Sequence, residues 1–200
     1  MNVRETTRSD LDDVARIHTA AFAGEIGPTV GLRYVRSFLQ WFVDAPDCVS
    51  LVVEHDGRII GYTFGAPGGY NPQLTRDLLP VIAMGVFRNL GRVARHPSFR
   101  RQIRSRVANI LLRREPRSAI ADATPAGIYC LVGIGTAADA RGKGAGKALV
   151  AALCERSGGR SVILDVFKDN APARALYERC GFEVLVEEGR VVRMIRPSAG

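Results

Sequence analysis

Long apolar runs are absent from this sequence. No stretch approaches the roughly 18 consecutive apolar residues that a membrane-spanning helix needs. The first eight residues, MNVRETTR, contain no apolar core of a secretion signal. We therefore expect a chain that is neither exported nor embedded in a membrane, and we predict a cytoplasmic location.

Cysteine and histidine are also scarce. The cysteines stand far apart, at positions 48, 130, 154 and 180, and form no Cys-x-x-Cys pair. With only three histidines in the chain, at positions 18, 55 and 96, neither a disulfide framework nor a metal site is predicted. We interpret the cysteines as reduced core residues and the histidines as helix, turn and loop residues without a catalytic role.

The composition is that of an ordinary globular protein. Hydrophobic residues make up 46% and charged residues 24% of the 200 positions, and this length suits a single domain over 1–200. The formal net charge of +8 is unevenly distributed, because the segment 68–126 contains eleven arginines and three acidic residues. The rest of the chain is therefore neutral. The excess positive charge belongs to this one segment and indicates what the segment contacts.

Periodicity and turn residues predict alternating strands and helices. Asp-Gly at 56–57 is typical of a tight hairpin turn, and Ser9 is expected to cap the first helix. The predicted strands are 2–6, 48–54, 58–65, 127–136, 162–167 and a closing hairpin within 182–195; the predicted helices are 9–22, 30–43, 71–95, 97–114, 143–156 and 171–180.

This order of elements predicts the fold class. A helix between two strands implies a parallel crossover, whereas the hairpins imply antiparallel neighbours. We therefore expect an α/β fold with one mixed sheet of about seven strands, flanked by helices. The segment 68–126 is a two-helix insertion between the third and fourth strands.

A glycine-rich basic loop precedes the helix predicted at 143–156. It reads Arg141-Gly142-Lys143-Gly144-Ala145-Gly146-Lys147. Glycines allow backbone to approach a ligand, and the free amides of a helix N-terminus attract phosphate oxygens. A magnesium-binding P-loop is excluded, because Arg141 stands at the first glycine position and Ala148 lacks a hydroxyl. A dinucleotide fingerprint at 133–138 is excluded too, since no helix begins there.

Two motifs in register resemble the GNAT superfamily of N-acetyltransferases. Arg141 to Gly146 resembles its Arg/Gln-x-x-Gly-x-Gly/Ala signature, and the stretch from Asp169 to Phe182, DNAPARALYERCGF, is similar to its second signature. The resemblance covers 1–67 in element order and 127–196 in order and motif. It implies an acetyl-CoA cosubstrate and no metal.

The resemblance also implies a set of cofactor-binding residues. The pantetheine arm of acetyl-CoA would pair with the strand backbone at Ile134, Gly135 and Thr136 and with Asn170, and Arg174 would lie near the adenosine phosphate. The pyrophosphate would be wrapped by Arg141, Gly142, Lys143, Gly144, Ala145 and Gly146. Gly133 and Gly135 are poor strand residues, which indicates either a close ligand approach or a bulge.

Tyr177 matches the tyrosine that protonates the departing thiolate in this family. A phenol near the sulfur suits that step, although a core tyrosine beside Phe182 is the alternative. Two carboxylates remain as candidates for the general base. Asp165 occupies the position of a carboxylate that some relatives use through water, and Glu25 lies in the loop where acceptors often bind.

The basic insertion has three possible roles. Within 97–114, apolar residues at helical spacing oppose arginines, so this stretch predicts an amphipathic helix. We favour a lid over the acceptor pocket, because too few aromatic residues accompany the arginines for membrane anchoring or nucleic-acid stacking. Contact with an anionic membrane surface and a homodimer through the insertion stay open as alternatives, and nucleic acid is disfavoured.

The predicted activity is transfer of an acetyl group from acetyl-CoA directly to an amine of a small molecule or peptide. Two alternatives remain, namely a non-catalytic sensor that binds coenzyme A and an acyltransferase that works at a membrane surface. The sequence contains no motif for the acceptor.

Overall fold

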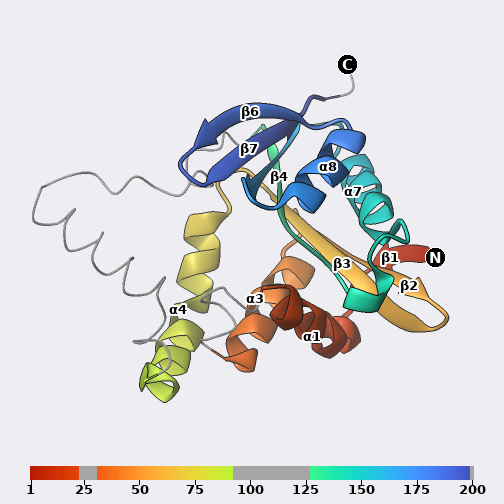
Figure 1. Ribbon diagram of the computed structural model, residues 1–200. Helices are drawn as coiled ribbons and strands as arrows, with labels where there is room; N and C mark the ends of the chain where they lie inside the picture. Colours follow the sequence, from red (N-terminus) through yellow and green to blue (C-terminus); the bar gives the residue numbers. More distant parts are fainter. Residues whose placement is uncertain (23–30, 92–126, 199–200) are drawn as a thin grey trace, which may run out of the picture.

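One mixed sheet forms the centre of the molecule (Figure 1). The computed structural model describes residues 1–22, 31–91 and 127–198. Its strands, in the spatial order β1-β2-β3-β4-β5-β7-β6, are β1 (Asn2–Glu5), β2 (Val49–His55), β3 (Arg58–Pro67), β4 (Tyr129–Thr136), β5 (Val162–Phe167), β7 (Val191–Arg196) and β6 (Glu183–Glu188). The α/β mixed sheet predicted from the sequence is confirmed.

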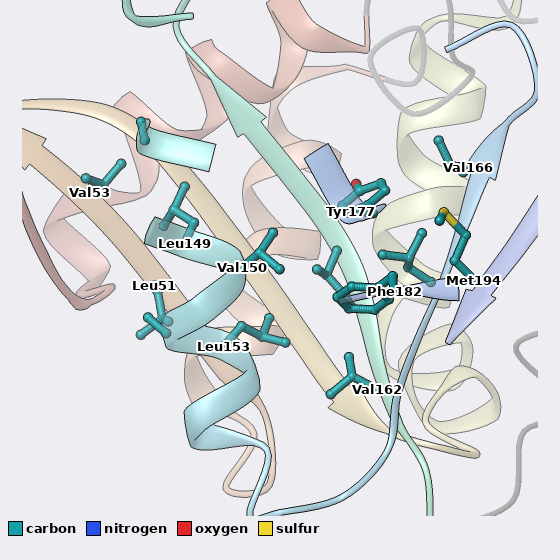
Figure 2. Packing of buried hydrophobic residues seen from close by; sticks show 14 of the residues in the cluster. Leu51, Val53, Leu149, Val150, Leu153, Val162, Val166, Tyr177, Phe182 and Met194 are labelled. Carbon is teal, nitrogen blue, oxygen red and sulfur yellow. The ribbon is translucent and has the colours of Figure 1, made fainter. Parts of the chain in front are cut away.

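Five α-helices of the described residues cover the two faces of this sheet (Figure 1). They are α1 (Leu11–Ala21), α3 (Leu32–Asp44), α4 (Asn71–Arg88), α7 (Ala145–Arg156) and α8 (Ala171–Arg179). Apolar side chains of α1, α3 and α4 form one core with β2 and β3, and those of α7 and α8 form a second core on the opposite face. In Figure 2 the second core is seen with Leu149, Val150 and Leu153 of α7 packed over the sheet.

Strand directions follow from the connections. The β2–β3 hairpin turns at Asp56 and Gly57, whose φ values of 51° and 71° are those of a type I′ turn. Strands β4 and β5 are parallel because α7 links them, and the other neighbouring strands pair in antiparallel fashion.

Two predicted element ends are wrong. Ser9 does not cap the first helix. It lies inside a short 3-10 helix, η1 (Arg8–Asp10), and Asp10 is the N-cap of α1. The Asp10 carboxylate accepts hydrogen bonds from Thr7 and Arg4 instead of staying in solvent, and the Arg4 guanidinium lowers its pKa to about 2.

The first insertion helix, predicted to reach residue 95, ends at Arg88 with Asn89 as its C-cap. The second predicted insertion helix, 97–114, and Glu25 lie outside the described residues. No helix of the described ranges is both long and apolar enough to cross a bilayer.

Candidate active site

Strands β4 and β5 are paired at one end and then separate. Their parallel register contains only two pairs, Tyr129 with Val162 and Cys130 with Ile163. Beyond Cys130, β4 stays paired with β3 on its other side, and β5 stays paired with β7. The backbone edges of the two strands that face each other therefore lack strand partners, and they form a fork. Ile134, Gly135 and Thr136, the predicted pantetheine segment, lie on the β4 side of this fork.

Gly133 and Gly135 leave room for aromatic rings of the neighbouring strand. A Cβ atom at Gly133 would lie 2.4 Å from the Phe64 ring, and one at Gly135 would lie 2.6 Å from the Tyr62 ring. The register also shifts between Phe64 and Gly65, so β4 contains a bulge here. The sequence predicted either a bulge or a close ligand approach at these glycines. The bulge is present, and the space beside the glycines is filled by aromatic rings of β3 on the face that α1 and α3 cover. The reason for the glycines at these positions becomes apparent only from the neighbouring strand β3.

The predicted phosphate loop connects β4 to α7 through a short 3-10 helix, η3 (Ala138–Ala140). Gly142 and Gly144 have positive φ values of 74° and 87°, a conformation that disfavours other residues. Gly144 is the N-cap of α7, and the amide of Ala148 is the first to donate within the helix, to the Gly144 carbonyl at 3.1 Å. No side chain caps this helix.

The amides of residues 145–147 therefore point out of the first turn of α7 without an intrahelical acceptor. Arg141, Lys143 and Lys147 are exposed around them. A cluster of free amides, the positive end of the helix dipole and three cations is the arrangement that binds phosphate oxygens.

The third glycine of the loop has a packing role. A Cβ atom at Gly146 would lie 3.1 Å from Leu176 Cδ2. Gly146 thus permits α7 to lie close against α8, and this contact holds the second signature segment beside the loop.

Asn170 and Arg174 belong to the start of α8. The Asn170 side chain caps this helix, accepting a hydrogen bond from the Ala173 amide at 3.3 Å, which leaves its own NH₂ group as a donor. The Nε atom of Arg174 is buried and has no hydrogen-bond partner in the described part of the chain.

Tyr177 projects from α8 into the second core beneath the fork (Figure 2). It is 5% exposed, and its ring centroid lies 5.8 Å from that of Phe182. Burial raises the pKa of the phenol to about 12, so the hydroxyl stays protonated at neutral pH. No described residue accepts or donates a hydrogen bond at this hydroxyl. A protonated phenol is what a general acid for a departing thiolate requires.

Asp165 lies on the opposite face of the sheet from Tyr177. Its neighbours Leu164 and Val166 pack into the second core, and side chains alternate along a strand. Both Asp165 oxygens accept hydrogen bonds from Arg193 on β7, with Nε to Oδ1 at 2.9 Å and Nη2 to Oδ2 at 3.1 Å. The sequence analysis did not identify Arg193, because its pairing with Asp165 depends on the β5–β7 register.

A pocket opens at the point where β4 and β5 separate. It is lined by Tyr70, Cys130, Leu131, Val132, Ile163, Leu164, Asp165 and Arg193. Its open volume, with the solvent-filled mouth included, is about 390 Å³. Tyr70 was also missed by the sequence analysis, because it precedes α4 in the insertion and comes near the fork only in the folded chain. Among the described residues, no group of three histidine, cysteine or acidic side chains could hold a metal ion.

Comparisons with known proteins agree with this fold. Similar folds include histone acetyltransferase HPA2 and related acetyltransferase from Corynebacterium glutamicum, at 17% identity over 100% of this chain and 97% of that chain with a TM-score of 0.61. Ribosomal-protein-alanine N-acetyltransferase from Brucella melitensis is similar at 18% identity over 98% of this chain and 99% of that chain, with a TM-score of 0.59. The paiA N-acetyltransferase from Thermoplasma acidophilum in complex with coenzyme A is similar at 14% identity over 98% of both chains, with a TM-score of 0.57.

At these identities the structural likeness shows the fold alone. A search of curated protein sequences finds no significant match. The family model described as Acetyltransferase (GNAT) family, however, matches residues 11–182 and thus spans both signature motifs and the fork. The chain therefore belongs to the GNAT family of N-acetyltransferases.

Proposed function

We propose that this chain transfers the acetyl group of acetyl-CoA directly to an amine of a small molecule or peptide. The observation that carries the proposal is the fork between β4 and β5, which opens beside the amide-rich start of α7. A structurally similar protein was solved in complex with coenzyme A, and the family uses acetyl-CoA.

The residues of this chain fit the cosubstrate. Free amides at 145–147 and the exposed side chains of Arg141, Lys143 and Lys147 would hold the pyrophosphate. The unpaired β4 edge at 134–136 and the Asn170 NH₂ group would bind the amides of the pantetheine arm. Arg174, with a buried Nε that lacks a partner among the described residues, would lie near the adenosine phosphate.

Bound acetyl-CoA supplies an electrophilic thioester carbonyl. The neutral acceptor nitrogen forms the new C–N bond, and the C–S bond breaks as Tyr177 gives its proton to the sulfur. One proton of the acceptor nitrogen leaves through Asp165 or a water beside it, and solvent returns a proton to Tyr177. Glu25 stays a predicted alternative for the base, as it lies outside the described residues.

For the insertion 68–126 we keep the proposal of a lid over the acceptor pocket, with Tyr70 on the pocket wall as its support. Co-sedimentation with anionic vesicles at two salt concentrations checks the alternative of membrane attachment, since electrostatic binding weakens with salt. The cytoplasmic location and the single domain stay predictions.

The proposed reaction is tested by measuring thiol release from acetyl-CoA with a panel of amines. We expect release that depends on the amine and yields an acetylated product detectable by mass spectrometry. Binding of acetyl-CoA without turnover on any amine would instead identify a sensor and contradict the proposal.

A further inference from the structure

The pocket at the fork contains one ion pair whose two charges both face the cavity. Asp165 and Arg193 line the pocket from adjacent strands, and the other lining residues are Tyr70, Cys130, Leu131, Val132, Ile163 and Leu164. The side chain of Arg193 is 12% exposed and that of Asp165 is 38% exposed. The Arg193 side chain is thus far less exposed than the arginines paired at the surface, such as Arg8, whose side chain is 71% exposed.

The guanidinium has donors left over after its contact with Asp165. A guanidinium carries five N–H groups, and the bonds from Nε and Nη2 to Asp165 use two of them. No described residue accepts a hydrogen bond from Nη1. Each Asp165 oxygen can also accept more than the one bond it receives. The pair therefore offers donors on one side and acceptors on the other within one pocket.

The charge balance of the pair selects the kind of ligand. Because Asp165 neutralises Arg193, a purely anionic or purely cationic ligand would leave an unbalanced charge beside a guanidinium that is only 12% exposed, which is costly. A ligand that carries both signs, with a carboxylate close to an amine, matches both groups and adds no net charge.

We propose that the acceptor is an amino acid or a similar zwitterion, whose carboxylate binds Arg193 Nη1 and whose ammonium group binds Asp165 at the mouth of the fork. The ammonium group first passes one proton through Asp165 to solvent, and the neutral nitrogen then attacks the thioester. This inference rests on the proposed function, because it names the acceptor of that reaction. The amine then lies where β4 and β5 separate, beside the strand edge assigned to the pantetheine arm.

The test compares matched ligands that differ only in the carboxylate. A panel of free amino acids and the corresponding amino acid carboxamides is titrated into the full chain saturated with coenzyme A, and binding is followed by calorimetry. We expect at least one amino acid to bind about 10-fold or more tightly than its carboxamide, as a site built for a charged group rejects the analogue that lacks it. When acetyl-CoA is the acetyl donor, the same ligand is expected to have the highest kcat/KM of the panel.

Two variants separate recognition from folding. Arg193→Gln is expected to reduce the preference for the free amino acid to about 2-fold or less, while its affinity for coenzyme A stays within about 2-fold of the parent. Arg8→Gln removes an arginine whose ion pair with Asp44 lies on the surface, and it serves as the matched control with no change. Melting curves and coenzyme A binding show whether each variant is folded.

The outcomes are distinguishable from failure of the proposed function. Equal binding of amino acids and carboxamides, or an unchanged preference in Arg193→Gln, overturns the zwitterion inference even if simple amines are acetylated. Preferential binding of an amino acid without acetyl transfer would support this site and contradict the proposed reaction.

Discussion

In the proposed reaction, the phenol of Tyr177 protonates the departing thiolate. Its ring is buried against Phe182, so removal of the hydroxyl alone leaves the packing in place. We predict that Tyr177→Phe lowers kcat by about 10²-fold or more, because the thiolate then departs without a proton donor. Thiol release under saturating substrates measures the effect, and a parallel thermal melt should coincide with that of the parent. Unchanged kcat would remove the role.

His18 provides a second prediction at a single residue. Its Nδ1 lies 2.7 Å from the Tyr62 hydroxyl, and burial lowers the pKa of the imidazole to about 4 from 6.5. The folded chain therefore resists protonation of His18, whereas the unfolded chain accepts it below pH 6.5. The contribution of neutral His18 to the free energy of unfolding is fully present above pH 6.5. It is lost as the pH falls from 6.5 towards 4.

We predict that the free energy of unfolding drops by about 2 kcal/mol between pH 7 and pH 4.5 through His18. Asp10, whose pKa is lowered to about 2, contributes only at more acidic pH. Urea titrations of the parent and of His18→Gln compare the two pH values. The substituted chain should show a much smaller drop, and equal drops would show that His18 does not account for the loss.

Among the elements, the contact between β3 and β4 depends on glycines. A Cβ atom at Gly133 would lie 2.4 Å from Phe64, whose ring is 2% exposed and packs against Phe38, Phe42 and Tyr62. We predict that Gly133→Ala destabilises the fold by about 2 kcal/mol, since a buried ring in a filled core cannot move freely. Urea unfolding measures the loss.

A smaller partner should relieve this clash. In a Phe64→Leu background, the further change of Gly133 to alanine should cost less than it does in the parent. Gly127→Ala is the matched control, because a Cβ atom there meets no atom of the described residues within 4 Å. Equal costs in both backgrounds would mean that the ring does not explain the glycine.

The elements also show what the sequence could predict. Asp56-Gly57 predicts its hairpin because the turn is local, and the strand 162–167 was predicted with its observed bounds. The glycine turn before α7 was likewise predictable from adjacent residues. The end of α4 at Arg88 was not, since the apolar pattern continues through Leu90 beyond the cap.

Features that need two distant segments escaped prediction. Glycine is required at positions 133 and 135 because the rings of Phe64 and Tyr62 occupy the space of a side chain there. The Asp165–Arg193 pair arises from the β5–β7 register. Ser9 looked like a cap by sequence, but the Arg4 side chain of β1 reaches Asp10 and fixes the start of the helix there. These are tertiary contacts that override a local preference.

For the molecule as a whole, the sheet separates two tasks. Helices α7 and α8 on one face carry the predicted phosphate loop and Tyr177, whereas α1, α3 and α4 cover the other face, to which Asp165 and Arg193 project. The fork between β4 and β5 is the opening between these faces. In the proposed reaction, the cosubstrate and the acceptor would approach from opposite faces of the sheet and meet at the fork.

The central claim is that this fork and the adjoining loop bind the acetyl carrier. Isothermal titration of the folded full chain with coenzyme A and with acetyl-CoA tests it most directly. We predict saturable binding of one molecule per chain, weakened about 10-fold by Arg141→Gln because one cation beside the pyrophosphate is lost. A chain that melts as a folded protein yet releases no binding heat with either compound, and shows no shift in melting temperature with them, would contradict the account.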